Sequence, residues 1–142
     1  MNRYAELKRC QQAEFSAFPM QFAFSDRQFA EGMAALGLGP TDTDKIYKAP
    51  GGGFYRREDS PRLEEMMERF DRELAEAIAA DETGEGFIYE MFLYELDNHE
   101  YGYTRDTEET LDALGYTAKQ VLGDPRLKRG IEKAVTEICK RD

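Results

Sequence analysis

This sequence has few of the residues that most often carry catalysis or bind metals. Among its 142 residues are one histidine, His99, two cysteines, Cys10 and Cys139, and no tryptophan. Neither cysteine lies in a Cys-x-x-Cys pair or in a cluster with histidine, which argues against a zinc finger and against a disulfide framework. We expect two reduced, partly buried thiols in a reducing compartment, although a bridge between the two ends of the chain remains open.

Long apolar runs are missing as well. The longest apolar-rich stretch, residues 87–96, is too short to cross a bilayer and contains two glutamates. Residues 1–9 have no apolar run after their bases, so they do not look like a secretory signal. We therefore expect a cytoplasmic protein that does not bind membranes.

Basic residues are nearly missing from one stretch that makes up a little under a quarter of the chain. Between Asp81 and Asp112 there are eleven carboxylates and one base, Arg105, a local charge that equals the formal net charge of −10 of the whole chain. Free nucleic acid is not expected to bind, because phosphate attraction needs clustered lysine and arginine. An acidic protein is drawn toward basic surfaces instead, so we expect a basic protein surface as the partner.

The residues that are present suffice for a folded core. Apolar residues make up 41% and aromatic residues 12% of a chain of one-domain length, which is globular composition. Apolar spacing and capping signals predict helices over about 2–18, 26–36, 60–80, 87–98, 107–114 and 125–138, and short strands near 20–24, 46–49 and 54–57. We expect one α+β domain over residues 1–142, mostly helical with a small β-hairpin or short sheet, and centred on helix 87–98.

The segment before the second predicted helix carries two local signals. Met20, Phe22 and Phe24 alternate with smaller or polar residues, which predicts an extended segment with one buried face. Ser25 and Gln28 have the spacing of a capping box, in which each side chain bonds to the backbone of the other residue. A helix is therefore expected to begin directly after Ser25.

His99 is the one conventional candidate for catalysis. If helix 87–98 continues to its end, Glu95 and His99 lie four residues apart on one face. A carboxylate that orients an imidazole is typical of a general base or a metal ligand, but it is also an ordinary ion pair in the last turn of a helix. We prefer the structural interpretation. The alternative is an enzyme or metal-dependent site formed by Glu95, His99 and Glu100, with Asp97 beside them.

Metal and cofactor motifs are incomplete. The loop that begins at Asp97 partly matches a calcium-binding frame, but His99 and Tyr101 occupy positions that need oxygen ligands. The glycines at 51–53 lack the Lys-Ser/Thr pair of a phosphate-binding loop and fit a flexible hairpin turn. We expect no metal and no cofactor.

Acids and tyrosines alternate after the central helix and form the surface to which we assign a partner. Tyrosine supplies contact area at low entropic cost, and clustered carboxylates select a basic partner. The predicted partner-binding residues are Glu100, Tyr101, Tyr103, Asp106, Glu108, Glu109 and Asp112. An ordinary solvated face, with the tyrosines closing a turn over the core, remains an alternative. The preferred function is a non-catalytic acidic protein-interaction module; assembly into a homo-oligomer through the helices is a third possibility.

Three segments also resemble a family of short proteins without assigned activity from bacterial and phage genomes. They are Phe22-Ala23-Phe24-Ser25 with the residues that follow it, Gly52-Gly53-Phe54, and Asn98-His99-Glu100-Tyr101-Gly102-Tyr103-Thr104 with Asp106. The resemblance covers approximately residues 15–116 and implies a bacterial or mobile-element context and a cytoplasmic location. The resemblance supplies no catalytic residues. A phage-style regulator or inhibitor of a basic, nucleic-acid-handling protein would fit the charge of the chain.

Overall fold

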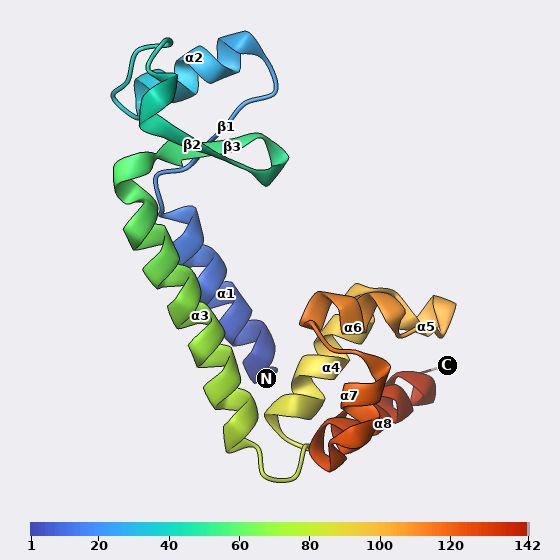
Figure 1. Ribbon diagram of the computed structural model, residues 1–142. Coiled ribbons are helices and arrows are strands. Elements are labelled where there is room, and N and C mark those ends of the chain that lie inside the picture. The colour runs from blue at the N-terminus through green and yellow to red at the C-terminus, as the bar shows by residue number, and fades with distance from the viewer. Residues whose placement is uncertain (142) are drawn as a thin grey trace. The chain divides into compact units, whose positions relative to one another are not determined.

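The computed structural model describes residues 1–141 and is mostly helical with one three-stranded antiparallel sheet, which confirms the predicted α+β class (Figure 1). The chain forms two compact units. One contains residues 11–71, and the other contains residues 1–10 together with the chain from residue 72 onward. Helices α1 (Arg3–Ser16) and α3 (Ser60–Ala80) contribute residues to both units. A single domain over the whole chain stays a prediction.

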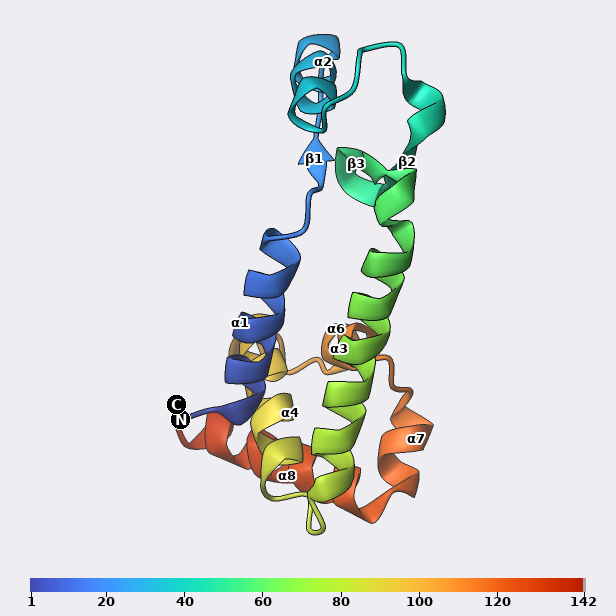
Figure 2. The same cartoon turned by 90° about the vertical axis from the view of Figure 1, so that its left-hand side faces the viewer.

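The unit of residues 11–71 contains the sheet. Its strands β1 (Gln21–Phe22), β2 (Ile46–Ala49) and β3 (Gly53–Arg56) are arranged in the order β1-β3-β2, so β3 is central (Figure 2). The predicted hairpin is confirmed, and its turn is a short 3-10 segment, Pro50–Gly52. Two further 3-10 turns, Thr43–Lys45 and Arg57–Asp59, precede β2 and α3.

Helix α2 (Asp26–Ala35) supplies the core of this unit together with the sheet. Met33 is fully buried and packs with the buried side chains of Leu36, Ile46 and Phe54. Gly32 allows the helix to approach the sheet, because a Cβ atom there would lie 2.6 Å from Cζ of Phe54. The close contact between Gly32 and the ring of Phe54 therefore helps to fix the position of α2 on the sheet.

The start of α2 follows the predicted capping signal with one change. The Ser25 hydroxyl accepts a hydrogen bond from the Gln28 backbone N–H at 3.2 Å, as the sequence pattern predicts. The Gln28 side chain, however, accepts from the backbone N–H of Phe24 at 2.7 Å, one residue before the expected donor. The cap therefore also fixes the backbone of Phe24.

The predicted buried face of segment 20–24 is wrong. Phe22 is 53% exposed and Phe24 is 81% exposed, whereas Ala23 packs against the small core of α2 and the sheet. Gln21 is the β1 residue that lies opposite Phe54, so the face of β1 toward the core carries Gln21 rather than Phe22. The side chains of this segment do alternate between two faces, but the set with Gln21 and Ala23 faces the core.

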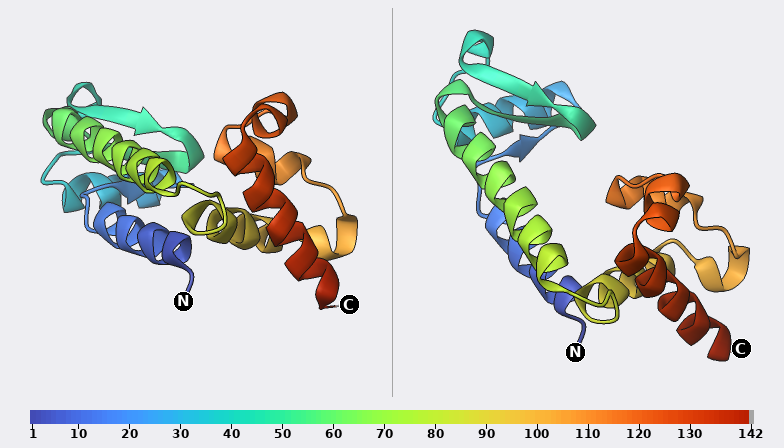
Figure 3. Two further views of the ribbon diagram at one scale, coloured as in Figure 1. Left: turned by 90° about the horizontal axis from the view of Figure 1, so that it is seen from below. Right: turned by 60° about the horizontal axis from the view of Figure 1, so that its bottom comes forward.

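The second unit is built around α4 (Phe87–Asn98), which is the predicted central helix. Ile88, Met91, Phe92 and Leu96 are fully buried in its core. Helix α8 (Pro125–Lys140) lies alongside α4 (Figure 3). Gly130 makes this approach possible, because a Cβ atom there would lie 2.6 Å from Cγ2 of Ile88.

Three short helices connect α4 to α8. They are α5 (Tyr101–Thr104), α6 (Glu108–Leu114) and α7 (Ala118–Gly123). The first replaces part of a predicted loop and the last replaces a predicted turn, and α7 begins with a complete capping box between Thr117 and Gln120.

The predicted burial of the cysteines is also wrong. Cys10 and Cys139 are both free and exposed. Separately, no helix in residues 1–141 combines the length and apolar character needed to cross a bilayer.

Candidate functional site

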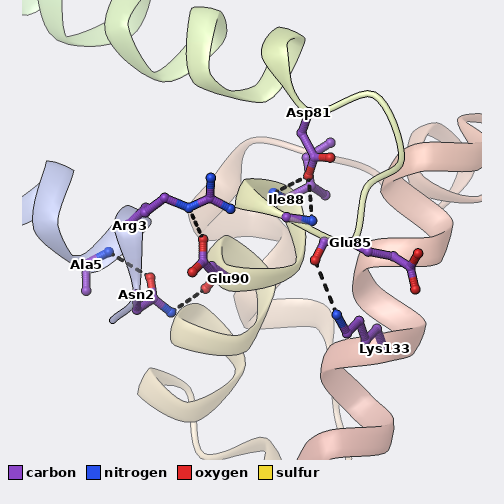
Figure 4. Close-up of polar contacts among 9 residues, drawn as sticks. Asn2, Arg3, Ala5, Asp81, Glu85, Ile88, Glu90 and Lys133 are labelled. Carbon is purple, nitrogen blue, oxygen red and sulfur yellow. Dashed lines mark hydrogen bonds and ion pairs between the residues drawn. The ribbon is translucent and has the colours of Figure 1, made fainter.

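The loop before α4 determines where that helix begins. Asp81, directly after α3, accepts hydrogen bonds from four backbone N–H groups, those of Thr83, Gly84, Gly86 and Ile88, at 2.9–3.3 Å. Figure 4 shows its carboxylate turned toward the first residues of α4. Gly86, the N-cap position, has no side chain to cap the helix, so a carboxylate five residues upstream does so.

The first residues of the chain attach to the same helix. Arg3 forms an ion pair with Glu90 at 2.7 Å, and the Asn2 side chain donates to the backbone oxygen of Glu90 at 2.8 Å (Figure 4). Both contacts bring the start of α1 to α4, which positions the next turns of α1 beside the second half of α4.

Glu95 is the buried charged group of this unit. Its side chain is 3% exposed, and Oε1 lies 3.6 Å from Nζ of Lys8. The Lys8 ammonium also lies 5.6 Å and 5.8 Å from the ring centres of Tyr4 and Tyr94. A carboxylate removed from water is thereby paired with a cation that two aromatic rings partly enclose. Nothing in the sequence pattern pointed to Lys8, because the pairing joins positions 87 residues apart.

His99 lies on the same face of α4, as the four-residue spacing predicts. Its Nε2 is 4.0 Å from Oε2 of Glu95, and its Nδ1 is 3.7 Å from Oε2 of Glu109 in α6. Both distances are longer than the donor–acceptor distance of a hydrogen bond. Within the described residues, Oε1 of Glu95 and Nε2 of His99 are buried and make no hydrogen bond. The imidazole therefore stands between two carboxylates without being oriented by either one.

The other groups near Glu95 are a neutral phenol and a hydroxyl that joins two helices. Burial raises the pKa of the Tyr4 hydroxyl far above its ordinary value, and the negative charge of Glu95 adds to this effect, so the phenol stays neutral. The hydroxyl of fully buried Thr110 donates to the backbone oxygen of Glu95 at 3.3 Å and ties α6 to α4. The cluster can hold α1, α4 and α6 together.

The remaining residues of the catalytic alternative do not converge on this cluster. Asp97 forms an ion pair with Arg141 at 3.0 Å. Glu100 is exposed and adopts a left-handed backbone conformation, with φ of 58°, between α4 and α5. Among residues 1–141, no three His, Cys, Asp or Glu side chains are grouped as metal ligands. The structure thus brings Glu95 and His99 together and places Asp97 and Glu100 elsewhere.

The acidic residues after α4 lie on the surface. The side chains of Glu100, Asp106, Glu108, Glu109 and Asp112 are all exposed, and we call this set, with Tyr103, the acidic surface. Glu109 is near His99, whereas the other four acids form no ion pair with any residue from 1 to 141. Tyr103 is 94% exposed, but Tyr101 is only 9% exposed and belongs to the core. Tyr101 is therefore not placed to act as an anchor.

Arg56 and Arg57 have partners close by in the unit of residues 11–71. Arg56 pairs with Asp59 at 3.0 Å and with Glu58 at 3.4 Å. Arg57 donates to the backbone oxygen of Ile46 and lies over the ring of Tyr47. Both arginines are therefore engaged within their own unit.

Comparison with known proteins identifies the family of this chain. No curated protein and no solved structure matches this chain. A family model described as a family of unknown function, DUF7659, matches residues 3–137, which is nearly the whole chain. The chain therefore belongs to the family of unknown function DUF7659.

Proposed function

We propose that this chain is a non-catalytic protein-interaction module that docks a basic protein surface through its acidic surface. The observation that carries the proposal is that Glu100, Asp106, Glu108 and Asp112 are exposed and form no ion pair within residues 1–141. An exposed carboxylate that makes no ion pair retains its attraction for an external cation. The 94% exposed ring of Tyr103 lies among them in the sequence and would add apolar contact area.

The partner class follows from the sign of the charge. A protein that handles nucleic acid presents clustered lysine and arginine, so an acidic surface competes for the same groups that hold phosphates. More specifically, we propose that this chain regulates or inhibits such a protein. It would be encoded by a phage or another mobile element and would act in the cytoplasm. Charge supports the partner class, and the resemblance motivates the biological setting.

The experiment compares two variants that carry the same net charge. The first neutralises the acidic surface by Glu100→Gln, Asp106→Asn, Glu108→Gln and Asp112→Asn. The second neutralises four exposed acids of α3 by Glu64→Gln, Glu65→Gln, Glu68→Gln and Asp71→Asn. Binding to immobilised poly-lysine is measured at increasing salt, since surface charge attraction weakens as ions screen it.

We expect the first variant to lose most of its binding and most of its salt dependence, while the second keeps both. Equal losses in the two variants would show that only net charge matters and would refute a localised docking surface. Tyr103→Ala then tests the aromatic contribution, with an expected loss of about threefold to tenfold in affinity if the ring is an anchor.

An enzyme centred on His99 has less support. A general base must reach its proton within a hydrogen bond and needs a group that orients it, but the contacts of His99 to Glu95 and Glu109 are 4.0 Å and 3.7 Å. Glu95 is paired with Lys8 at 3.6 Å, so this carboxylate already has a partner within the chain.

A further inference from the structure

A second surface lies in the unit of residues 11–71, where a groove of about 510 Å³ opens beside the start of α2. Apolar side chains of α2, the sheet and the preceding segment line much of it: Ala23, Phe29, Ala49 and Phe54. The groove has the volume of an ordinary binding site, and its aromatic lining comes from the small core of this unit. It shares no residue with the acidic surface.

Phe24 stands at this groove and is the most exposed phenylalanine of the described chain, at 81%. Its position is fixed. Its backbone N–H donates to Gln28 at 2.7 Å, and its ring lies against Gly52, where a Cβ atom would be 3.1 Å from Cε1. Gly52 has a φ of 80°, which a glycine adopts without strain. Phe24 and the apolar lining of the groove thus form one contiguous apolar surface, which is the kind of surface that marks an interaction site.

The groove also carries one acid and one base. Asp26 and Lys48 both line it, and neither forms an ion pair with another residue in the range 1–141. Asp26 lies in the first turn of α2, where a carboxylate is favoured, and Lys48 projects from the edge strand β2. A partner that fits must therefore supply an aromatic or aliphatic side chain, a cation for Asp26 and an anion for Lys48.

We propose that the groove binds a second copy of this chain in a two-fold symmetric dimer. In a two-fold interface, if one residue contacts another across the axis, the second also contacts the first. Phe24 of each copy then enters the groove of the other, and Asp26 of each copy meets Lys48 of the other. The chain itself presents the ring, the groove and both charges, which is the complementarity that such an interface requires.

Sedimentation equilibrium of the full chain tests the proposal over concentrations from about 1 µM to about 1 mM, a range that detects even weak association. We expect reversible dimerisation, weakened about tenfold or more by Phe24→Ala. Leu122→Ala is the matched control, because Leu122 is 66% exposed on α7 in the other unit. We expect this control variant to have the same dissociation constant as the wild type. A chain that stays monomeric throughout this range overturns the proposal.

A charge swap tests the pairing itself. Asp26→Lys and Lys48→Asp each place like charges opposite one another in the dimer and should weaken it about fivefold or more, whereas the double variant should restore most of the affinity. Asp26→Lys also weakens α2, but the double variant keeps that defect, so restoration reports the contact between copies. Circular dichroism confirms that each variant is folded. Failure of the double variant to recover, with a folded chain, overturns the proposed geometry.

Discussion

Asp81 offers the sharpest test of how this fold is held together. Its carboxylate accepts four backbone hydrogen bonds within the loop and first turn that connect α3 to α4. Two of the four donors, Gly84 and Ile88, are buried residues, so an N–H left without an acceptor there cannot turn to water without local opening. The other two donors belong to residues that solvent reaches.

The magnitude follows from those two buried donors. An unsatisfied buried N–H costs about 1.5 kcal/mol, so Asp81→Ala should lower the free energy of unfolding by about 3 kcal/mol at neutral pH. Asp81→Asn retains one acceptor oxygen and should lose about half of that. The control is Glu82→Gln, which removes the same charge from an exposed neighbour and should change stability by less than about 0.5 kcal/mol.

The pH dependence has a definite sign. Burial acts to raise the pKa of the Asp81 carboxyl, but the backbone N–H groups of Ile88, Gly84, Gly86 and Thr83 outweigh it and hold the pKa below its ordinary value of 3.8. A carboxylate whose pKa is lowered in the folded state stabilises the protein above its unfolded pKa, and this stabilisation is lost as pH falls through the folded pKa. The difference between the wild type and Asp81→Asn should therefore be complete above about pH 5 and shrink below about pH 4.

Two measurements check this prediction. Urea unfolding followed by circular dichroism gives the free energy, and amide hydrogen exchange gives the local protection of Ile88. We expect Asp81→Ala to lower both, while Glu82→Gln lowers neither. If the Ile88 amide keeps its protection in Asp81→Ala and the free energy changes by less than about 1 kcal/mol, the carboxylate does not cap α4 and the reasoning fails.

Three further predictions concern the unit that contains α4. Gly130→Ala should cost about 2 kcal/mol in thermal unfolding by overpacking, since its Cβ would lie 2.6 Å from Ile88, while Gly123→Ala, which meets no neighbour within 4 Å, should cost less than about 0.5 kcal/mol; equal effects would contradict the packing argument. Glu95→Gln should change the free energy of unfolding by less than about 1 kcal/mol, because removing the charge also removes its desolvation cost; a loss above about 3 kcal/mol would show that the pair with Lys8 is strongly stabilising. Burial and the charge of Glu95 raise the pKa of Tyr4 in the folded state, so the neutral phenol stabilises the fold fully below its ordinary pKa of 10.0, and this stabilisation is lost as pH rises through the folded pKa. The free energy of unfolding of Tyr4→Phe should therefore fall less steeply than that of the wild type above about pH 10. Identical alkaline profiles of the two proteins would contradict this prediction.

Local signals in the sequence account for much of the fold. The Ser25 cap, the proline at position 125 after Asp124, and the apolar periodicity of 87–98 each act within a few residues, and the structure has helices at all three places. The four-residue spacing of Glu95 and His99 likewise placed them on one face, because helix geometry alone determines it.

Predictions failed where partners come from distant segments. Alternation in 20–24 cannot show which face of β1 meets the core, since the pairing of Gln21 with Phe54 decides it. The acidic neighbours of Tyr101 predict a surface anchor, yet α5 turns this side chain into the core of the unit around α4. Lys8 near the start of the chain became the partner of Glu95 only through the packing of α1 on α4.

By itself the sequence determined the six predicted helices, the small sheet and the excess of carboxylates between Asp81 and Asp112, since these depend on composition and on neighbours close along the chain. Tertiary structure alone decided which side chains reach solvent. It buried Glu95 and Tyr101, and it left Phe24 and Tyr103 exposed. The physical reason is that burial depends on contacts between segments far apart in sequence, whereas helix formation depends on residues three and four positions apart.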